Sequence, residues 1–210
     1  FEQALDVDFV SYLSAKVGYR GRLGVLAEIG AHLPVAPGVM IGAGLGLYSS
    51  RGVMVGPSGY YHRTDGDRLV DGSLRSGYIH DSGDRRTDVL GNPVPRDRSF
   101  VTWEHRQRLG PRFSLDGMFN YWSDSEIIRD FRHQQFDRVQ QPDSFIEAAY
   151  TADNLSLGAF ARFHPNPYHR VPERLPELRF DLFASPAALG FYERLEASAA
   201  VLESDAFGAE

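Results

Sequence analysis

The sequence predicts an all-β protein: an antiparallel up-and-down transmembrane β-barrel, of which this chain supplies about ten strands. Three observations lead to this prediction. Polar and apolar residues alternate along many segments, most of these segments reach ten or more residues, and both short and long connections separate them. Strands of soluble sheets usually have about five or six residues, whereas a tilted strand that crosses a bilayer needs about 9–11.

The composition agrees with a single unit, residues 1–210, that is rich in strands and turns. The chain has 21 Gly, 12 Pro and 24% charged residues, which fits neither a disordered chain nor a helical membrane protein. Its net charge of −6 argues against a nucleic-acid partner, because a protein that binds nucleic acid needs positive charge to balance the phosphates. The sequence begins at Phe1 without an apolar targeting segment, so we expect a piece of a longer protein.

Residues 29–50 show the alternation most clearly. They carry no charged side chain over about the length of a membrane-spanning helix, but they contain Pro34, Pro37 and five glycines, which disfavour a helix. From Gly38 onward apolar and small residues alternate strictly, as on a strand with one apolar face. The same period recurs, and we expect ten strands at residues 22–31, 38–49, 52–63, 68–80, 98–109, 111–123, 144–152, 154–164, 176–183 and 188–202.

The connections have the layout of an outer-membrane barrel, with short turns on one side and long loops on the other. We expect short turns at 49–51, 109–110 and 152–154, and long polar loops at 81–97, 124–143 and 165–175. Within the second long loop, Asp124 or Ser125 is placed to cap a short helix from Glu126 to Phe131.

A soluble β-sandwich also has alternating strands, so the pattern alone leaves two architectures open. Against the sandwich, the non-apolar faces carry small residues and isolated charges. Tyr and Trp also gather near strand ends, as in the aromatic girdles of membrane barrels. The residues concerned are Tyr48, Tyr60, Tyr61, Tyr78, Tyr121 and Trp122.

No motif predicts an enzyme, a cofactor or a metal. The run Gly42-x-Gly44-x-Gly46 lacks the spacing and the following helix of a dinucleotide-binding loop. A cluster of His62, Asp65 and Asp67 contains metal-ligating types, but Asp-Gly-Asp between two strands is what a hairpin turn requires. We therefore predict no catalytic residue, no cofactor and no metal site.

Several short motifs carry a resemblance to a known family. Trp103-Glu104-His105 lies within one predicted strand, and Ser123-Asp124 followed by Asp130-Phe131 begins where the next strand ends. Together with others in the same order, these motifs resemble the barrel of the lipopolysaccharide (LPS) assembly protein family LptD, from about Gly18 to Leu202. The other motifs are Gly21-Arg22-x-Gly24, Leu33-Pro34 with Ala36-Pro37, Tyr48-x-x-Arg51-Gly52, and Arg174-Leu175-Pro176-Glu177-Leu178.

The resemblance implies transport without chemistry, in the bacterial outer membrane. In LptD barrels, LPS rises through a periplasmic jellyroll domain and leaves through a lateral opening between the first and last strands. Its sugars pass through the polar lumen while its acyl chains stay in the bilayer. The implied partners are LPS, membrane lipid, an LptE-type lipoprotein that plugs the lumen, and an LptA-type periplasmic bridge that feeds the jellyroll.

The chain departs from the family pattern in what it contains. Neither the jellyroll nor the C-terminal barrel strands are recognisable, so we expect the N-terminal part of a barrel of about 26 strands. An isolated segment would leave two unpaired edges, which favour aggregation. A general outer-membrane porin shares the strand pattern without these motifs and remains the alternative function, followed by a soluble binding module.

The resemblance also suggests roles for single residues. Pro34 and Pro37 either loosen strand pairing near the lateral opening or only end a strand, because proline cannot donate to the ladder. Arg51-Gly52 is expected to shape a tight turn. Asp124 and Asp130-Phe131 are expected to fold the long loop over the barrel mouth. Trp103 is expected to face lipid or to anchor the barrel at the membrane interface, rather than to bind a ligand. Four inward arginines, Arg75, Arg162, Arg179 and Arg194, either contact phosphorylated sugars or pair with inward carboxylates.

Overall fold

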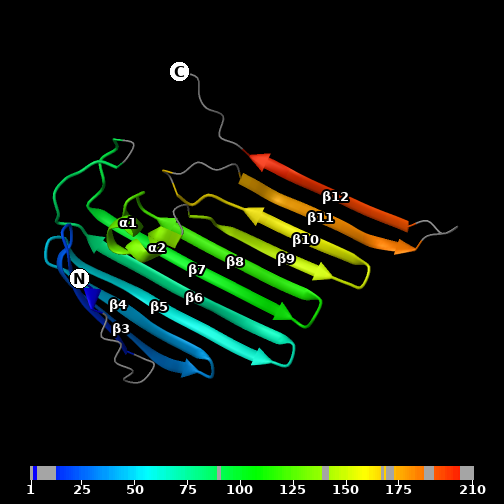
Figure 1. Cartoon of the computed structure of the whole chain (residues 1–210), viewed down its shortest axis with the longest axis horizontal. Helices are drawn as coiled ribbons and strands as arrows, with labels where there is room; N and C mark the ends of the chain where they lie inside the picture. The colour runs from blue at the N-terminus through cyan, green and yellow to red at the C-terminus, as the bar shows by residue number, and fades with distance from the viewer. Residues whose placement is uncertain are drawn as a thin grey trace, which may run out of the picture.

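The computed structural model describes residues 2–3, 13–88, 91–138, 142–166, 168, 173–186 and 192–203. The strands among them form one antiparallel sheet in which each pairs with its neighbours along the chain (Figure 1). The predicted all-β, up-and-down arrangement is confirmed. The strands are β1 (Glu2–Gln3), β2 (Leu13–Arg20), β3 (Gly24–Ala36), β4 (Val39–Tyr48), β5 (Gly52–Asp65), β6 (Arg68–His80), β7 (Asp97–Leu109), β8 (Phe113–Trp122), β9 (Phe145–Thr151), β10 (Leu155–Arg162), β11 (Glu173–Pro186) and β12 (Tyr192–Glu203).

Two further strands precede the ten that the sequence predicts. The predicted strands correspond to β3–β12, whereas β1 and β2 were not expected. β2 pairs with β3 from Leu13 opposite Ala31 to Arg20 opposite Gly24. Because its outward residues Ala15 and Val17 alternate with Lys16 and Gly18, the signal for this strand is present in the sequence.

One face of the sheet, the outer face, is apolar and exposed. The register places Leu45 opposite Val55, and Leu157 opposite Tyr150 on one side and Phe180 on the other, so apolar stripes of neighbouring strands share this face. Leu33 is 69% exposed, Ile41 56% and Leu178 56%. Within the described residues no second sheet covers these side chains. A wall that faces lipid leaves its apolar side chains uncovered, whereas a soluble sandwich buries them under a second sheet.

The opposite face, the inner face, carries small and charged residues. Across the middle strands, Ser58, Arg75, Thr102 and Asn120 follow one another in register. Charged residues on β11 and β12 continue this face, with Asp181 opposite Glu196. A face that combines polar groups with glycine and serine suits the wall of a water-filled lumen.

The two ends of the sheet differ, and Figure 1 shows the contrast. One end, the short-turn end, joins its strands by the turns 37–38, 66–67, 110–112 and 152–154. The other, the long-loop end, carries 81–96, 123–144 and 163–172, and the helices α1 (Ile127–Phe131) and α2 (His133–Arg138). The turn at 49–51 also lies there, because β4 and β6 run in the same direction. We expected this turn at the opposite end, with the other short turns, and that prediction was wrong.

The buried core lies at the long-loop end, between α1 and the inner face. Ile127 and Ile128 of α1 are fully buried, and they pack on residues from β3 to β8. Tyr48 and Trp122 belong to this core with 3% and 1% exposure, so their expected role in an aromatic girdle was wrong. The core consists of Leu23, Leu26, Tyr48, Met54, Ile79, Phe100, Trp122, Ile127, Ile128 and Phe131.

Candidate functional site

The helix α1 begins at Ile127, one residue after the predicted start, and its N-cap residue is Glu126, whose side chain makes no capping hydrogen bond. The expected cap at Asp124 or Ser125 was therefore wrong. The Glu126 backbone N–H donates a hydrogen bond to Asp124 Oδ1 at 3.0 Å, so a carboxylate lies at the positive end of the helix. Ser123 Oγ donates to the same carboxylate at 2.9 Å, and accepts from the Ser99 backbone N–H at 3.0 Å. The motif Ser123-Asp124 therefore ties the end of β8 to β7 and starts the helix.

Arg98 is the centre of a buried ionic cluster directly beneath this helix. Its side chain has no exposed surface, and its Nε and Nη2 atoms bind the two oxygens of Asp124 at 2.9 and 2.6 Å. Its Nη1 atom donates to Asp81 Oδ2 at 2.9 Å and to Asp130 Oδ2 at 2.8 Å. One guanidinium thus holds carboxylates from two separate loops, in the bidentate geometry that favours arginine over lysine.

Arg51 and Arg86 complete the loop cluster, which we define as Arg51, Arg86, Arg98, Asp81, Asp124 and Asp130. Arg51 Nε donates to Asp81 Oδ1 at 2.6 Å, and its guanidinium lies 5.1 Å from the centre of the Phe131 ring. Arg86 forms an ion pair with Asp130. The cluster contains equal numbers of arginines and aspartates, so its buried charges are compensated.

The cluster corrects two expectations. Gly52 has the expected positive φ of 113°, but Arg51 does more than shape a turn, because only 6% of it is exposed. Asp81, the first residue of the expected polar loop 81–97, is also only 6% exposed. Arg98 and Arg86 were not singled out. The signal that would have found Arg98 is its place one residue inside the start of β7, because Arg51, Asp81 and Asp124 also lie within two residues of strand ends on the long-loop side.

Charge pairing sets the ionisation of the loop residues. Burial by itself raises the pKa of Asp81, but hydrogen bonds from Arg51, the Gly83 amide and Arg98 outweigh it, and the pKa is lowered to about 2. For Arg86, burial and the nearby positive charges of Arg51 and Arg98 lower the pKa. Asp81 therefore stays ionised at any physiological pH, and its ion pairs with Arg51 and Arg98 act as a fixed structural link.

We call α1, α2 and the loop residues 81–86 and 123–126 the cap. The third long loop is tied to the same region, since Asn166 accepts a hydrogen bond from the Trp122 N–H at 2.7 Å and donates one to the Asn120 carbonyl at 2.9 Å. In Figure 1 the two helices lie across the middle strands near the long-loop end. Asp124 and Asp130 contact Arg98 of β7 and Phe131 belongs to the buried core, so the second long loop lies against the inner face of the sheet.

The motif Trp103-x-His105 lies on the outer face. Trp103 stacks on His105 with the ring centres 5.6 Å apart, and it lies over Gly117 of β8. The Tyr61 hydroxyl is 2.7 Å from His105 Nδ1. An aromatic group with a polar edge suits the border between hydrocarbon and headgroups.

Pro176 lies in β11, between the paired residues Arg174 and Glu177, where the register shifts.

Three of the four inward arginines pair with carboxylates. Arg162 contacts Asp143 at 3.0 Å, and Arg179 contacts Glu177 at 2.6 Å. Arg194 pairs with Glu196 of its own strand. The fourth, Arg75, lies between uncharged cross-strand neighbours, Ser58 and Thr102.

The two prolines lie at the short-turn end of β3. Pro34 is opposite Met40 of β4, and Pro37 is in the turn between these strands. β2 extends the sheet beyond β3, so neither proline is in the edge strand. The described pairing of β2 with β3 stops at Ala31, and Pro34 lies beyond it.

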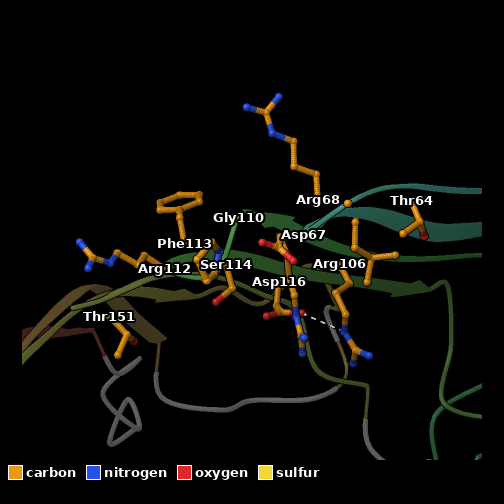
Figure 2. A pocket seen from close by; sticks show the side chains of 14 residues that line it. Thr64, Asp67, Arg68, Arg106, Gly110, Arg112, Phe113, Ser114, Asp116 and Thr151 are labelled. Carbon is orange, nitrogen blue, oxygen red and sulfur yellow. Dashed lines mark hydrogen bonds and ion pairs between the residues drawn. The ribbon is translucent and has the colours of Figure 1, made fainter. Parts of the chain in front are cut away.

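A second charged site opens at the short-turn end and is shown in Figure 2. This cavity, about 540 Å³, lies around the turns that follow β5 and β7. Arg106 and Asp116 form an exposed ion pair at 3.3 Å, and Arg68 points to the opposite side of the sheet. Arg112 pairs with Asp153, also exposed, at 3.3 Å. Such pairs contribute little to stability, so this site is an open rim rather than a built pocket.

The described residues contain no group of three or more side chains that could together hold a metal ion. His62 instead contacts Asp71, 3.0 Å away, with both side chains exposed. Within the same ranges no helix is long and apolar enough to cross a membrane.

Comparison with known families decides the identity of this sheet. A family model described as LptD, LPS transport system D, matches residues 96–206. The chain belongs to this family. The match covers β7–β12 and three of the motifs, those at Trp103, Ser123 and Arg174, whereas the resemblance at Gly21, Leu33 and Arg51 lies before it. A search of the curated proteins found no match. Membership of LptD places the chain in LPS transport at the outer membrane.

The loop cluster joins the part of the chain that precedes the family match to the matched residues 96–206. Arg51, outside the matched residues, contacts Asp81 and lies within 3.4 Å of Asp130, which is inside them. The two halves therefore share a buried network as well as a continuous sheet. This contact gives the Arg51 motif a physical connection to the matched segment.

Proposed function

We propose that this LptD chain forms the N-terminal part of a barrel wall that inserts LPS into the outer leaflet through a lateral gate. The observation that carries the proposal is the contrast between the two faces of the sheet. The outer face exposes leucine, isoleucine and valine, and the inner face presents charged and hydroxyl groups. Such a wall lets acyl chains remain in the bilayer while sugars move along the inner face.

The proposal includes two further proteins as partners of this chain. An LptE-type lipoprotein would lie against the inner face as a plug, and an LptA-type bridge would deliver LPS through a jellyroll domain. The sheet has β1 and β12 at its edges. Each edge requires a pairing strand in a membrane, because unpaired backbone groups are costly in hydrocarbon. A weak seam between such strands is the proposed exit for LPS, and no bond is made or broken in the process.

A general porin is the competing function, and depletion of the full-length protein separates the two. For the LPS exporter, we expect LPS at the cell surface to fall, measured by surface labelling, while new LPS accumulates inside the cell. For a porin, uptake of small solutes would fall and surface LPS would stay constant. Co-purification of a lipoprotein with the full-length protein is a second expected result.

A further inference from the structure

Charged side chains on the outer face are confined to one part of the sheet. Within the described strands β2 to β10, they reach this face only near the ends of β5, β6 and β7. At the short-turn end Arg63 of β5 lies opposite Val70, and Asp65 lies opposite Arg68 of β6. At the long-loop end the outer-face carboxylate is Asp97 of β7. The apolar wall therefore has a basic area at its short-turn end.

The length of β6 places its two ends outside the hydrocarbon of a bilayer. The strand runs from Arg68 to His80 and has 13 residues. At about 3.4 Å per residue it is roughly 40 Å long. A barrel strand is tilted by about 40°, so β6 spans roughly 30 Å across the membrane, more than the apolar band of about 25 Å. Because the short turns of outer-membrane barrels are periplasmic, Arg68 lies at the headgroups of the periplasmic leaflet.

Two aromatic rings on the outer face lie next to this basic area, on the side of the membrane centre. Tyr61 precedes Arg63 by two residues, so both point outward from β5. A Cβ added at Gly72 would lie 2.3 Å from the Tyr61 hydroxyl, and one added at Gly117 would lie 3.2 Å from the Trp103 ring. Each ring therefore lies over a glycine, and the two form an apolar floor beside the basic area.

A chain of polar groups crosses the same border. The Tyr61 hydroxyl is 2.7 Å from His105 Nδ1, and His105 Nε2 is 3.4 Å from Gln107 Oε1. Gln107 lies opposite Val70 of β6, in the same cross-strand row as Arg63. Polar groups that face lipid need hydrogen-bonding partners. The ester and hydroxyl oxygens of a lipid headgroup lie at this depth and can supply partners for the Gln107 amide.

Both arginines of the basic area are available to a ligand. Arg63 and Arg68 are exposed, and among the described residues neither takes part in an ion pair. In Figure 2, Arg68 extends away from the sheet on the face opposite to Arg106 and Asp116. A guanidinium binds phosphate through two parallel hydrogen bonds. With Asp65 as the nearby carboxylate, the area keeps an excess of positive charge, which favours a headgroup of net negative charge over a zwitterionic one.

We propose that Arg63, Arg68, Tyr61, Trp103 and Gln107 form a binding site for an anionic phospholipid of the periplasmic leaflet. The arginines bind the phosphate, and the Gln107 amide binds the oxygens of the glycerol. The first carbons of the acyl chains pack on the rings of Tyr61 and Trp103. This site lies on the outer face and goes beyond the proposed function, because it requires lipid contact but no transport.

The test uses the full-length protein in nanodiscs that contain phosphatidylethanolamine and phosphatidylglycerol in equal amounts. A trace of photoactivatable phosphatidylglycerol is added, and crosslinks are located by mass spectrometry of protease fragments. We expect them in β5–β7. The variant Arg63→Gln with Arg68→Gln should lower this crosslinking about tenfold, because each arginine near an anionic surface adds to the attraction. A photoactivatable phosphatidylethanolamine should crosslink to β5–β7 at the same low level in both proteins.

The matched control removes two arginines from the same end of the sheet but from its inner face. It is Arg106→Gln with Arg108→Gln, since Arg106 is opposite Asp116 and Arg108 is opposite Ser114 in β8. The charge change is the same, and crosslinking to phosphatidylglycerol should stay as in the unaltered protein. All four arginines are exposed, so both variants retain the fold, checked by heat-modified gel mobility.

Inorganic phosphate has the same chemistry as the lipid phosphate, so a further arm adds it to the nanodiscs. Sodium phosphate should lower crosslinking no more than sodium chloride of equal ionic strength. Stronger competition by phosphate assigns the arginines to the free ion and contradicts the lipid site. Equal crosslinking in the two double variants, equal crosslinking of the two lipids, or crosslinks outside β5–β7 also contradict it. Surface LPS after depletion tests the proposed function separately, so either can fail alone.

Discussion

Arg98 is the residue on which the cap depends most directly. Replacing it with Met removes the common partner of Asp81, Asp124 and Asp130 and leaves buried carboxylates undercompensated. We expect the free energy of unfolding, measured by urea titration in detergent, to fall by about 3–5 kcal/mol. The matched change Arg194→Met breaks an exposed pair with Glu196 and should cost about 0–1 kcal/mol. Equal losses for the two variants would contradict the central role of Arg98.

The lowered pKa of Asp81 gives the cap a defined dependence on pH. A carboxyl whose pKa is about 2 in the folded protein, below its ordinary value of 3.8, stabilises the fold fully above pH 3.8. That stabilisation is lost as the pH falls through 3.8 toward 2. Protease cleavage within residues 81–97 should therefore stay slow from pH 7 to pH 5, and increase after exposure to pH 2–3. Cleavage that already accelerates near pH 6 would point to a histidine instead.

At the residue scale, the sequence predicts conformation better than it predicts ionic partners. The positive φ at Gly52 follows from the turn itself. The burial of Arg51 does not, because it depends on Asp81 and Asp130, which lie 30 and 79 residues further along the chain. A local pattern identifies which side chains point inward at strand ends, but it does not show which loops fold back to meet them.

Among the elements, β4 shows how closely adjacent strands approach on the inner face. A Cβ added at Gly42 would lie 1.9 Å from the Ala31 carbonyl oxygen of β3, whereas one added at Gly44 meets nothing within 4 Å. Gly42→Ala should lower the free energy of unfolding by roughly 1–3 kcal/mol, because backbone must move. Gly44→Ala, on the same face two residues along, should change it little. Urea titration of both variants checks this, and similar values for the two would show that β3 can shift at no cost.

β3 carries the pair of prolines whose role the sequence left open. Pro34 has no N–H to donate, and it lies past the described pairing between β2 and β3. If this weakness serves the exit of LPS, replacing Pro34 and Pro37 with Ala strengthens pairing and slows export, measured by pulse labelling of surface LPS. The control, Pro57→Ala in β5, lies away from the sheet edge. Unchanged surface LPS in the double variant would leave the prolines with the single role of ending a strand.

Strand positions were predictable because polar and apolar residues alternate within each strand and so mark its two faces. The ten expected segments correspond to β3–β12 with ends that differ by up to about five residues, and α1 begins one residue after its expected start at Glu126. β2 was overlooked because its eight residues include Lys16 and Arg20, which interrupt the apolar appearance of the segment. These basic residues face inward, where Lys16 is opposite Glu28 and Arg20 is opposite Gly24 of β3.

At the scale of the whole molecule, everything proposed requires that the outer face contacts lipid. The 210-residue sequence has no cysteine, so a single cysteine introduced into it can carry one fluorescent label. Leu157 lies on the outer face of β10 and is 46% exposed, and its neighbour Ser156 lies on the inner face opposite Asp181. In bilayers of the full-length protein, with any cysteine outside this sequence replaced by serine, brominated acyl chains should quench a label at position 157 strongly, and one at position 156 weakly. Iodide in water should quench the two labels in the opposite order. Because adjacent residues of one strand share depth and local mobility, only the direction of the side chain distinguishes them. Equal quenching of both labels by lipid would mean that the sheet does not separate hydrocarbon from a lumen, and the transport proposal would fail.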